Sequence, residues 1–337
     1  MTDSANSQPE WTAPRVCVIT LNWKNPSDTI ECVASLKDAL IPVEDIVVVD
    51  NGSGDDSVDR IRTAHSDVTL LEMPHNLGFA EGNNVGIRHA LERGADYVLL
   101  LNNDTVVDPG LVPALLDAWN AVSAPGFIGA RIYYHDDRNR IWMGMPRWND
   151  AQSQFEFEGR DELDASASIG NPVEVAYTCG CALFTAASVV NEIGFMDERY
   201  FCYYEEVDWC FRAKAKGFRS FVAPPAKVWH KVSMSSGGKD APAVRYYRTR
   251  NSLNFARDHL SAKARRKMFR RAAHQALGHM GWKETGLVLT LKRVYWNLLT
   301  MKNDIHIKAW RWGVRDYCLR RFGPCPDALQ KAGDARA

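Results

Sequence analysis

The sequence has no run of 18 uninterrupted apolar residues, so it predicts no helix that spans a lipid bilayer. Its eight cysteines include no CxxC pair, and the Cys179-x-Cys181 spacing is too tight for the usual zinc or redox patterns. We therefore expect buried free thiols. Residues 1–14 are polar and lack the apolar core of a signal peptide, which favours a disordered lead segment.

Common phosphate-binding loops are missing as well. A dinucleotide-binding fold would carry GxGxxG after its first strand, but the sequence there reads NWKNPSD. The glycine-rich basic loop of a sugar nucleotidyltransferase is absent from the same place, and no GxxxxGK[ST] occurs anywhere in the chain. A nucleotide would have to be held through its base and ribose, with a cation to neutralise its phosphates.

The distribution of charge is uneven, although the net charge is zero and the composition is that of an ordinary globular protein, with 46% hydrophobic and 24% charged residues. Residues 261–337 hold 17 Lys/Arg and 5 Asp/Glu, a balance of +12, which leaves −12 for residues 1–260. A basic terminal segment suggests an anionic partner, either a membrane surface or a nucleic acid. No recognised nucleic-acid-binding module accompanies this charge, so nucleic acid is not expected.

Strands and helices alternate over the first hundred residues. The predicted strands are apolar and β-branched, and each predicted helix is amphipathic and begins at proline, glycine or acidic signals. This alternation is typical of βαβ units, which form a parallel sheet covered by helices on both faces. The predicted strands are 15–23, 46–50, 68–73 and 96–104, and the helices between them end near residues 40, 64 and 94.

Polar side chains stand where three of these strands end, at Asn22, at Asp50-Asn51 and at residues 102–104, which read Asn-Asn-Asp. Parallel sheets bind ligands at the carboxyl ends of their strands. We therefore expect these side chains to line one binding edge. The Asp108-Pro109 pair is expected to start the following helix.

The pattern changes after residue 126 to short β-like pieces. A polar insert at 152–170 is predicted to be a flexible loop, and a second unit follows at about 173–232. Beyond residue 242, apolar positions with helical spacing are interleaved with basic residues, and no internal repeat is visible. The helices expected there lie near 242–260, 262–280, 284–302 and 305–321.

Six segments occur in an order that is typical of one family. They are VCVITLNW, VVVDNGSGD, HNLGFAEGNNVGI, LNNDT, YYEEVDWCFR and AKVWHK, and YYRTRNSLNF follows at 246–255. Together they resemble the family 2 glycosyltransferases of the GT-A fold, in the rhamnosyltransferase-like branch, over residues 15–260. The resemblance implies an α/β fold with a mostly parallel sheet flanked by helices. It also implies a metal-dependent, inverting transfer of a sugar from a nucleotide diphosphate donor to a glycan hydroxyl.

The resemblance assigns roles to individual residues. Asp104 takes the place of the DxD-type metal motif and His230 that of the late histidine, so these two are the expected ligands of Mg²⁺ or Mn²⁺. The residues expected near the donor are Thr20, Asn22, Asp50, Asn76, Gly78, Asn83, Asn84, Asn102 and Asn103. The analogy favours deoxythymidine diphosphate-rhamnose as donor, although members of this branch use several sugars.

Two departures from the family pattern affect the chemistry. Asn102 and Asn103 leave Asp104 as the one charged member of the metal motif, so His230 and the donor diphosphate gain importance as ligands, and a histidine ligand favours Mn²⁺ slightly. Glu206 stands where the family has aspartate, and by position it is the expected catalytic base. A cap or turn role for Asp104 and a structural role for His230 are the alternatives.

Glu205, Glu206 and Asp208 place three acids within four residues. Mutual repulsion is expected to raise the pKa of the base towards neutrality. The alternative is a helix start in which the acids stabilise the macrodipole. Asp208 is expected to orient the site or to hold that helix start.

The C-terminal segment carries four tryptophans among its basic residues, at positions 282, 296, 310 and 312. Basic amphipathic helices with tryptophan fit an anionic membrane surface, and residues 261–321 are the predicted contact. The protein would then be cytoplasmic and peripheral on the inner face of the cell membrane, acting on a lipid-linked precursor of a cell-surface polysaccharide. Packing of these helices on the catalytic part, or a homo-oligomer contact, is the alternative.

The predicted organisation has four parts: a lead at 1–14, a nucleotide-sugar-binding half at 15–125, an acceptor-binding and catalytic half at 126–240, and a basic helical extension at 241–337. A protein of the same fold that binds nucleotide sugars without catalysis is the alternative function. Donor hydrolysis or transfer in the presence of metal separates the two.

Overall fold

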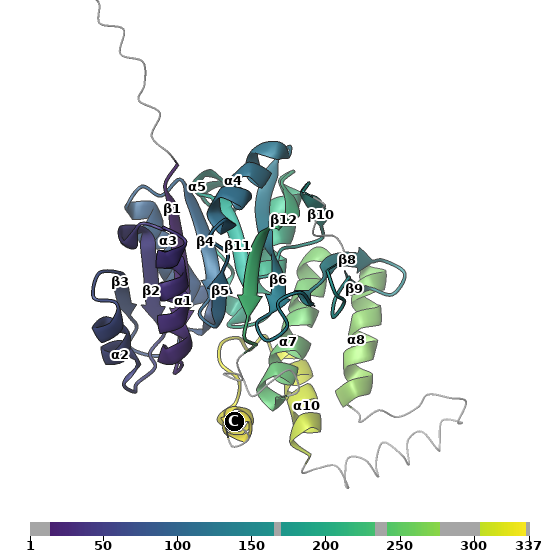
Figure 1. The fold of residues 1–337 in the computed structure, drawn as a ribbon. Coiled ribbons are helices and arrows are strands. Elements are labelled where there is room, and N and C mark those ends of the chain that lie inside the picture. Colours follow the sequence, from purple (N-terminus) through teal and green to yellow (C-terminus); the bar gives the residue numbers. More distant parts are fainter. Residues whose placement is uncertain (1–13, 165–169, 233–240, 277–303, 335–337) are drawn as a thin grey trace, which may run out of the picture.

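A computed structural model describes residues 14–164, 170–232, 241–276 and 304–334 of the chain (Figure 1). The predicted alternation of strands and helices in the first half is confirmed. The strands are β1 (Val16–Asn22), β2 (Ile46–Asp50), β3 (Thr69–Glu72) and β4 (Tyr97–Asn102), and the helices are α1 (Pro26–Asp38), a 3₁₀ turn (Val43–Asp45), α2 (Ser57–Ala64), α3 (Gly78–Glu92) and α4 (Leu111–Ala121). Helix α4 begins at Leu111 rather than at the Asp108-Pro109 pair, since Gly110 is its N-cap.

The second half is richer in short strands. These are β5 (Thr105–Val107), β6 (Pro125–Tyr134), β7 (Ile141–Met143), β8 (Met145–Asn149), β9 (Gln154–Glu158), β10 (Val173–Val175), β11 (Ala182–Ala186) and β12 (Arg219–His230). The helical elements between them are α5 (Ala187–Ile193), a 3₁₀ turn η2 (Glu198–Tyr200) and α6 (Glu205–Ala215).

Ten of the strands that the structure describes form one sheet in the order β10-β12-β6-β11-β4-β1-β2-β3, with β5 paired to β12 and β7 to β6. Strands β4, β1, β2 and β3 are parallel, which confirms the prediction for the first half. Strand β11 runs antiparallel to both of its neighbours, β4 and β6, so the sheet becomes mixed beyond β4. The fold is of the GT-A type, and the predicted binding edge lies at the carboxyl ends of the parallel strands.

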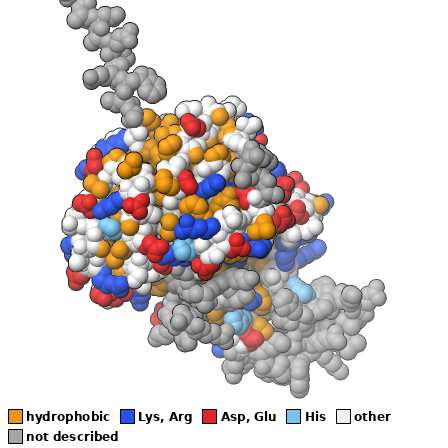
Figure 2. Space-filling view, in the orientation of Figure 1, with side chains coloured by type: hydrophobic (Ala, Val, Ile, Leu, Met, Phe, Trp, Pro, Cys, Tyr) orange, Lys and Arg blue, Asp and Glu red, His pale blue; other side chains and the backbone are white. Residues whose placement is uncertain are grey.

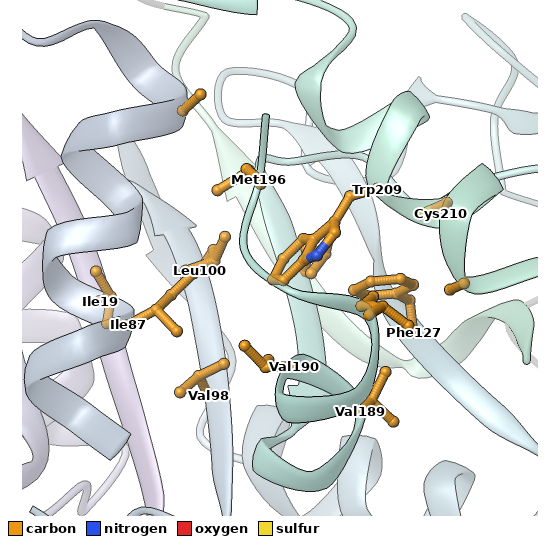
Figure 3. Close-up of a cluster of buried hydrophobic side chains, with 14 of the residues drawn as sticks. Ile19, Ile87, Val98, Leu100, Phe127, Val189, Val190, Met196, Trp209 and Cys210 are labelled. Carbon is orange, nitrogen blue, oxygen red and sulfur yellow. The ribbon is translucent and has the colours of Figure 1, made fainter. Parts of the chain in front are cut away.

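Helices cover both faces of the sheet, which is why the strands are apolar along their whole length. On one face of the sheet, Ile19 of β1 belongs to the same buried cluster as Ile87 of α3 and Trp209 of α6, whereas Val18 belongs to the cluster with α1 and α4 on the other face. Figure 3 shows the first of these layers, in which Leu100, Phe127 and Trp209 lie between the sheet and its helices. Fully burying a side chain such as isoleucine or phenylalanine contributes about 1.5–3 kcal/mol. The packing in these two layers therefore stabilises the central strands of the sheet.

The polar insert at 152–170 contains a β-strand, which corrects the prediction of a flexible loop. Residues 154–158 form β9, which pairs with β8 in a two-stranded antiparallel hairpin. The alternation of Gln154-Phe155-Glu156-Phe157-Glu158 explains the difference, because it places both phenylalanines on one face of the strand. Phe155 packs edge-to-face against Trp148 and Tyr177.

Three of the four predicted C-terminal helices are confirmed, and the fourth, predicted at 284–302, lies outside the described residues. The structure adds a short helix that was not predicted, at 327–334. The C-terminal helices lie below and to the right of the sheet in Figure 1. No helix in the described ranges has the length and apolar character needed to cross a bilayer. The helices are α7 (Pro242–His259), α8 (Ala262–Ala276), α10 (Ile305–Cys318) and α11 (Asp327–Asp334).

Candidate active site

Asp104 and His230 are brought together by the pairing of β5 with β12. His230 lies opposite Thr105 in the antiparallel register, and the backbone N–H of Lys231 donates to the carbonyl of Asp104 at 2.9 Å. As a result His230 Nε2 lies 2.9 Å from Asp104 Oδ1, and both side chains are largely buried. The family resemblance predicted that these two residues share a site, but no local pattern indicates the strand pairing that brings them together across 126 positions of the sequence.

The two side chains have the geometry of neighbouring ligands on one cation. Ligand bonds of about 2.1 Å at a right angle place two donor atoms about 3 Å apart, close to the spacing found here. No group of three or more His, Cys, Asp or Glu suited to a metal occurs within the described ranges, so the remaining ligands would come from the donor and from water. His230 Nδ1 has no hydrogen-bond partner among these residues, and its ring is held by Trp142 at 4.3 Å.

A buried network of amides and hydroxyls ties the ends of β1, β2 and β4 together. Asn22 donates to Asp50 Oδ2 at 2.7 Å, and Asp50 also accepts hydrogen bonds from the backbone and the hydroxyl of Ser53. Asn22 Oδ1 accepts from the hydroxyl of Thr29, which in turn accepts from Asn103 at 2.9 Å. The predicted donor residues Asn22, Asp50 and Asn103 are therefore brought to one edge, and the network keeps that edge rigid.

The segment at the start of α3 joins the same edge. Asn51 donates to Asn76 and to the carbonyl of Gly78, and its own oxygen accepts from the backbone of Leu77. Gly78 has φ +86°, and a Cβ there would lie 2.5 Å from the carbonyl oxygen of Phe201. Only glycine fits this position, because both the backbone conformation and the space exclude a side chain.

Three of the predicted donor residues are turned inwards. Thr20 and Asn84 are completely buried, and Asn83 is 2% exposed and donates to the carbonyl of Phe79 within its own helix. Asn84 donates to the carbonyl of Met196 at 2.9 Å and accepts from its N–H at 3.1 Å. These contacts hold α3 against the segment before η2, whereas Asn76, Asn102 and Asn103 remain partly exposed at the edge.

The segments that carry Asp104 and Glu206 approach each other at residues 179–181. The N–H of Asn102 donates to the carbonyl of Cys181 at 2.9 Å, so this turn follows directly on the end of β4. A Cβ on the neighbouring Gly180 would lie 3.4 Å from the ring of Phe79 and 3.7 Å from the Cβ of Glu206. The start of α6, the start of α3 and the end of β4 therefore converge, as the site requires.

Glu205 and Glu206 lie in the first turn of α6, where Glu205 is buried and Glu206 is half-buried. Glu205 is 4% exposed, and one carboxylate oxygen of each residue has no hydrogen-bond partner among the described residues. Burial, reinforced by the charge of Glu206, raises the pKa of Glu205 well above its ordinary value. Burial also raises the pKa of Glu206, opposed by backbone N–H groups and by Arg248. A raised pKa makes a carboxylate better suited to the general-base role that is predicted for Glu206.

Asp208 has surroundings of a different kind. It accepts hydrogen bonds from Arg212 at 2.8 Å and from His259 of α7 at 2.7 Å. Burial acts to raise its pKa, but these two partners outweigh burial and hold the pKa below the ordinary value. Asp208 is thus a buried ion-pair partner that fixes α6 on α7. The predicted mutual repulsion is confined to the two glutamates.

Sequence reasoning missed several residues that shape the site. Ser53 binds the predicted strand-end side chains of Asn22 and Asp50, and its place three residues after Asp50 was the available signal. Trp142, which packs on His230, lies in β7, and no motif marks it. Arg250 and Asn251 stand in the segment at 246–255, for which the sequence suggested no role.

The comparisons with known proteins agree with this geometry. The sheet order and the polar strand ends are those of the GT-A class of nucleotide-sugar transferases. The chain is a glycosyltransferase. Residues 16–184 match the model of glycosyl transferase family 2, and the protein belongs to that family.

Two curated relatives are rhamnosyltransferases. The dTDP-rhamnosyl transferase RfbF of Shigella flexneri is 26% identical over 220 residues, which cover 62% of this chain and 69% of the relative. The N-acetylglucosaminyl-diphospho-decaprenol L-rhamnosyltransferase of Mycobacterium tuberculosis is 27% identical over 233 residues, which cover 61% and 72%. This chain is similar to both, in keeping with the rhamnosyltransferase-like branch.

Among solved structures, the chain is similar to the mannosyltransferase PcManGT from Pyrobaculum calidifontis, determined in complex with GDP-Man and Mn²⁺. The TM-score is 0.56 with 15% identity, over 92% of this chain and 88% of that one. At this identity the likeness establishes the fold alone. GalNAc-T7 with UDP, GalNAc and Mn²⁺ gives a TM-score of 0.57 with 12% identity, over 91% of this chain and 57% of that one.

Proposed function

We propose that the protein transfers a sugar, with inversion, from a nucleotide diphosphate-sugar to a hydroxyl of a lipid-linked glycan. The observation that carries this proposal is that the segments bearing the Asp104–His230 pair and Glu206 converge at residues 179–181. The names of the two relatives support rhamnose as the sugar and a diphospho-lipid glycan as the acceptor.

In the proposed mechanism Glu206 accepts the proton of the acceptor hydroxyl while that oxygen attacks the anomeric carbon. The bond between this carbon and the diphosphate oxygen breaks, and the electron pair leaves with the nucleoside diphosphate. Asp104 and His230 would hold Mg²⁺ or Mn²⁺, which supplies charge neutralisation at the diphosphate when bound. The network around Asp50 positions the nucleoside end of the donor, and Trp142 keeps His230 oriented.

A panel of nucleotide sugars tests this function. With Mn²⁺ present, the correct donor at about one hundred times its Kd should stabilise the protein by about 2.7 kcal/mol, a rise in Tm of roughly 5 °C. The same donor should then release nucleoside diphosphate when a polyprenyl-diphosphate glycan is added. Stabilisation by a donor without any sugar release would instead indicate a binding protein of the same fold.

We further propose that α8 brings the enzyme to an anionic membrane surface. Lys263, Arg266, Lys267 and Arg270 recur at helical spacing on one exposed side, line a hollow of about 360 Å³ and have no acidic residue within their helix. Elsewhere acidic and basic side chains are interspersed over the sheet domain (Figure 2). Lipid phosphates would be attracted to such a row of cations.

Lys267 and the neighbouring Arg271 also attach α8 to the loop that joins β8 and β9. Arg271 donates to the carbonyl of Gln152 at 2.6 Å and to the side chain of Gln154 at 3.2 Å, and Lys267 donates to the carbonyl of Ala151 at 2.5 Å. Membrane contact through α8 would thus orient the half of the molecule that is predicted to receive the acceptor.

Changing Lys263, Arg266 and Arg270 together to glutamine should weaken binding to phosphatidylglycerol vesicles about 100-fold, since each cation near the surface contributes about 1 kcal/mol. Binding to neutral phosphatidylcholine vesicles should stay weak for both proteins. The matched control changes Lys214, Lys216 and Arg219, three exposed cations between the end of α6 and the start of β12, to glutamine. Equal vesicle binding by the two triple variants in a flotation assay would contradict the proposal.

A further inference from the structure

The loop at 200–204, which leads into the two glutamates, has an unusual backbone. Phe201, Tyr203 and Tyr204 adopt φ values of +63°, +69° and +78°, although none is glycine. Each such residue costs roughly 1–3 kcal/mol, and the conformation persists only where its surroundings enforce it. The loop ends at Glu205, so its conformation decides where Glu205 and Glu206 lie.

One side chain of α7 binds most of this loop. Asn251 is completely buried, and its Nδ2 donates to the carbonyls of Tyr200, Cys202 and Tyr203 at 2.8, 2.8 and 2.7 Å. The amide group therefore replaces the hydrogen bonds that a regular element would supply to these carbonyls. Removing it would leave buried carbonyls without a donor beside strained backbone.

Arg250 fixes the orientation of that amide. Its Nε donates to Asn251 Oδ1 at 3.0 Å, which directs the NH₂ group towards the loop, and its Nη2 donates to the carbonyl of Tyr200 at 3.0 Å. The guanidinium is fully buried and lies over the rings of Tyr246 and Tyr247 at 5.2 and 5.3 Å. The ring of Tyr247 also stacks on Phe201 of the loop at 5.5 Å.

Residues 316–325 of the C-terminal segment form hydrogen bonds with Arg250 and with the two tyrosines beneath it. Arg250 Nη1 donates to the carbonyl of Gly323 at 2.7 Å, and the hydroxyl of Tyr246 donates to Asp316 at 2.8 Å. The N–H of Cys325 donates to the hydroxyl of Tyr247 at 2.7 Å. A continuous set of contacts thus runs from residues 316–325 through α7 to the loop before α6.

On the basis of the proposed function, we propose that Arg250 and Asn251 are positioning residues of the transferase. They impose the conformation of the loop at 200–204 that delivers Glu206 to the acceptor hydroxyl, and residues 316–325 hold them in place. The C-terminal extension is therefore part of the catalytic unit, in addition to any contact it makes with a membrane.

The test compares Asn251→Ala with Asn254→Ala in the full chain. Asn254 is a buried asparagine on the same helix, 3% exposed, and its amide has no hydrogen-bond partner among the described residues, so it is a matched control. We expect Asn251→Ala to lower kcat about 100-fold, because a displacement of about 1 Å costs that much. The Kd of the nucleoside diphosphate should change less than threefold.

A second readout separates positioning from general destabilisation. The acid limb of the pH–kcat profile should move to lower pH in Asn251→Ala, because a relaxed loop admits water to Glu206. The groups that face Glu206 (Glu205, Tyr177, Cys179, Cys202 and Arg248) are unchanged in this variant. Asn254→Ala should keep the wild-type profile.

Arg250→Lys covers the case in which Asn251→Ala does not fold. Lysine keeps the charge but loses the planar fork, so kcat should fall at least tenfold with the same shift of the acid limb. Wild-type kcat and pH profile in both variants would overturn this inference and leave the proposed function intact. Failure of the wild-type protein to transfer any sugar would overturn both.

Discussion

Glu206→Gln is expected to lower the rate of sugar transfer by about 10²–10⁴-fold, the usual contribution of a positioned base. The amide keeps the shape of the side chain but does not accept the hydroxyl proton. Nucleoside diphosphate binding, measured by calorimetry with Mn²⁺, should stay within threefold of the wild-type value. Asp104, His230 and the network around Asp50 are unaffected by the change.

Glu205→Gln is the matched control, one residue earlier on the same helix. Glu205 is 4% exposed, and burial with the neighbouring charge raises its pKa well above the ordinary value, which favours its neutral form. The glutamine amide resembles that neutral form, and transfer should fall less than tenfold. A large loss here combined with retained activity in Glu206→Gln would reassign the base to Glu205.

The same pair of residues sets the expected pH dependence. Glu206 must be ionised to act, and burial raises its pKa, so kcat should fall as pH drops through a value above that of an ordinary glutamate. The fall should come from the reaction step, with donor binding nearly constant over the same range. A profile that stays flat down to pH 4 would contradict the assignment.

Asp104→Asn should abolish the metal-dependent part of donor binding, raising the Kd of the nucleoside diphosphate in Mn²⁺ at least tenfold. The amide keeps an oxygen 2.9 Å from His230 Nε2 but removes the one negative charge of that pair. In EDTA, wild type and variant should bind the nucleotide with the same weak affinity. Binding of Mn²⁺ to the protein decreases the electron paramagnetic resonance signal of the free ion. This decrease should be smaller for Asp104→Asn than for wild type, and the measurement does not depend on activity.

Asp108→Asn is the control for this change, because it removes an equal charge four residues further along the chain. Asp108 accepts a hydrogen bond from the N–H of Gly110 at the start of α4, and Asn retains an oxygen for that bond. Its Mn²⁺ and nucleotide binding should match the wild type. If EDTA leaves sugar transfer unchanged, the metal role of Asp104 and His230 is wrong.

Much of the first half could be predicted because its signals are local. The apolar runs of β1, β2 and β4 and the turn residues after them specify strands that are buried on both faces, and the polar strand ends indicate the binding edge. The start of α6 could be placed for the same reason. These features depend on neighbours in the sequence.

The rest of the site depends on contacts between distant segments. The pairing of Asp104 with His230 follows from the register of β5 on β12, which no local pattern reveals. Asn251 looks like any helical asparagine until the loop at 200–204 is seen against it. The alternation of Phe155 and Phe157 was readable as a strand, but its polar neighbours favoured a loop.

The place of β11 between β4 and β6 has a consequence for protein engineering. The boundary at residue 125 separates two stretches of sequence, but β11 comes from the later stretch and is hydrogen-bonded to the last parallel strand of the earlier one. A fragment ending at 125 would expose β4 as an unpaired, fully apolar edge, which is a template for aggregation. Chimaeras that exchange donor and acceptor halves should therefore be joined outside the sheet, and isolated halves should precipitate when expressed alone.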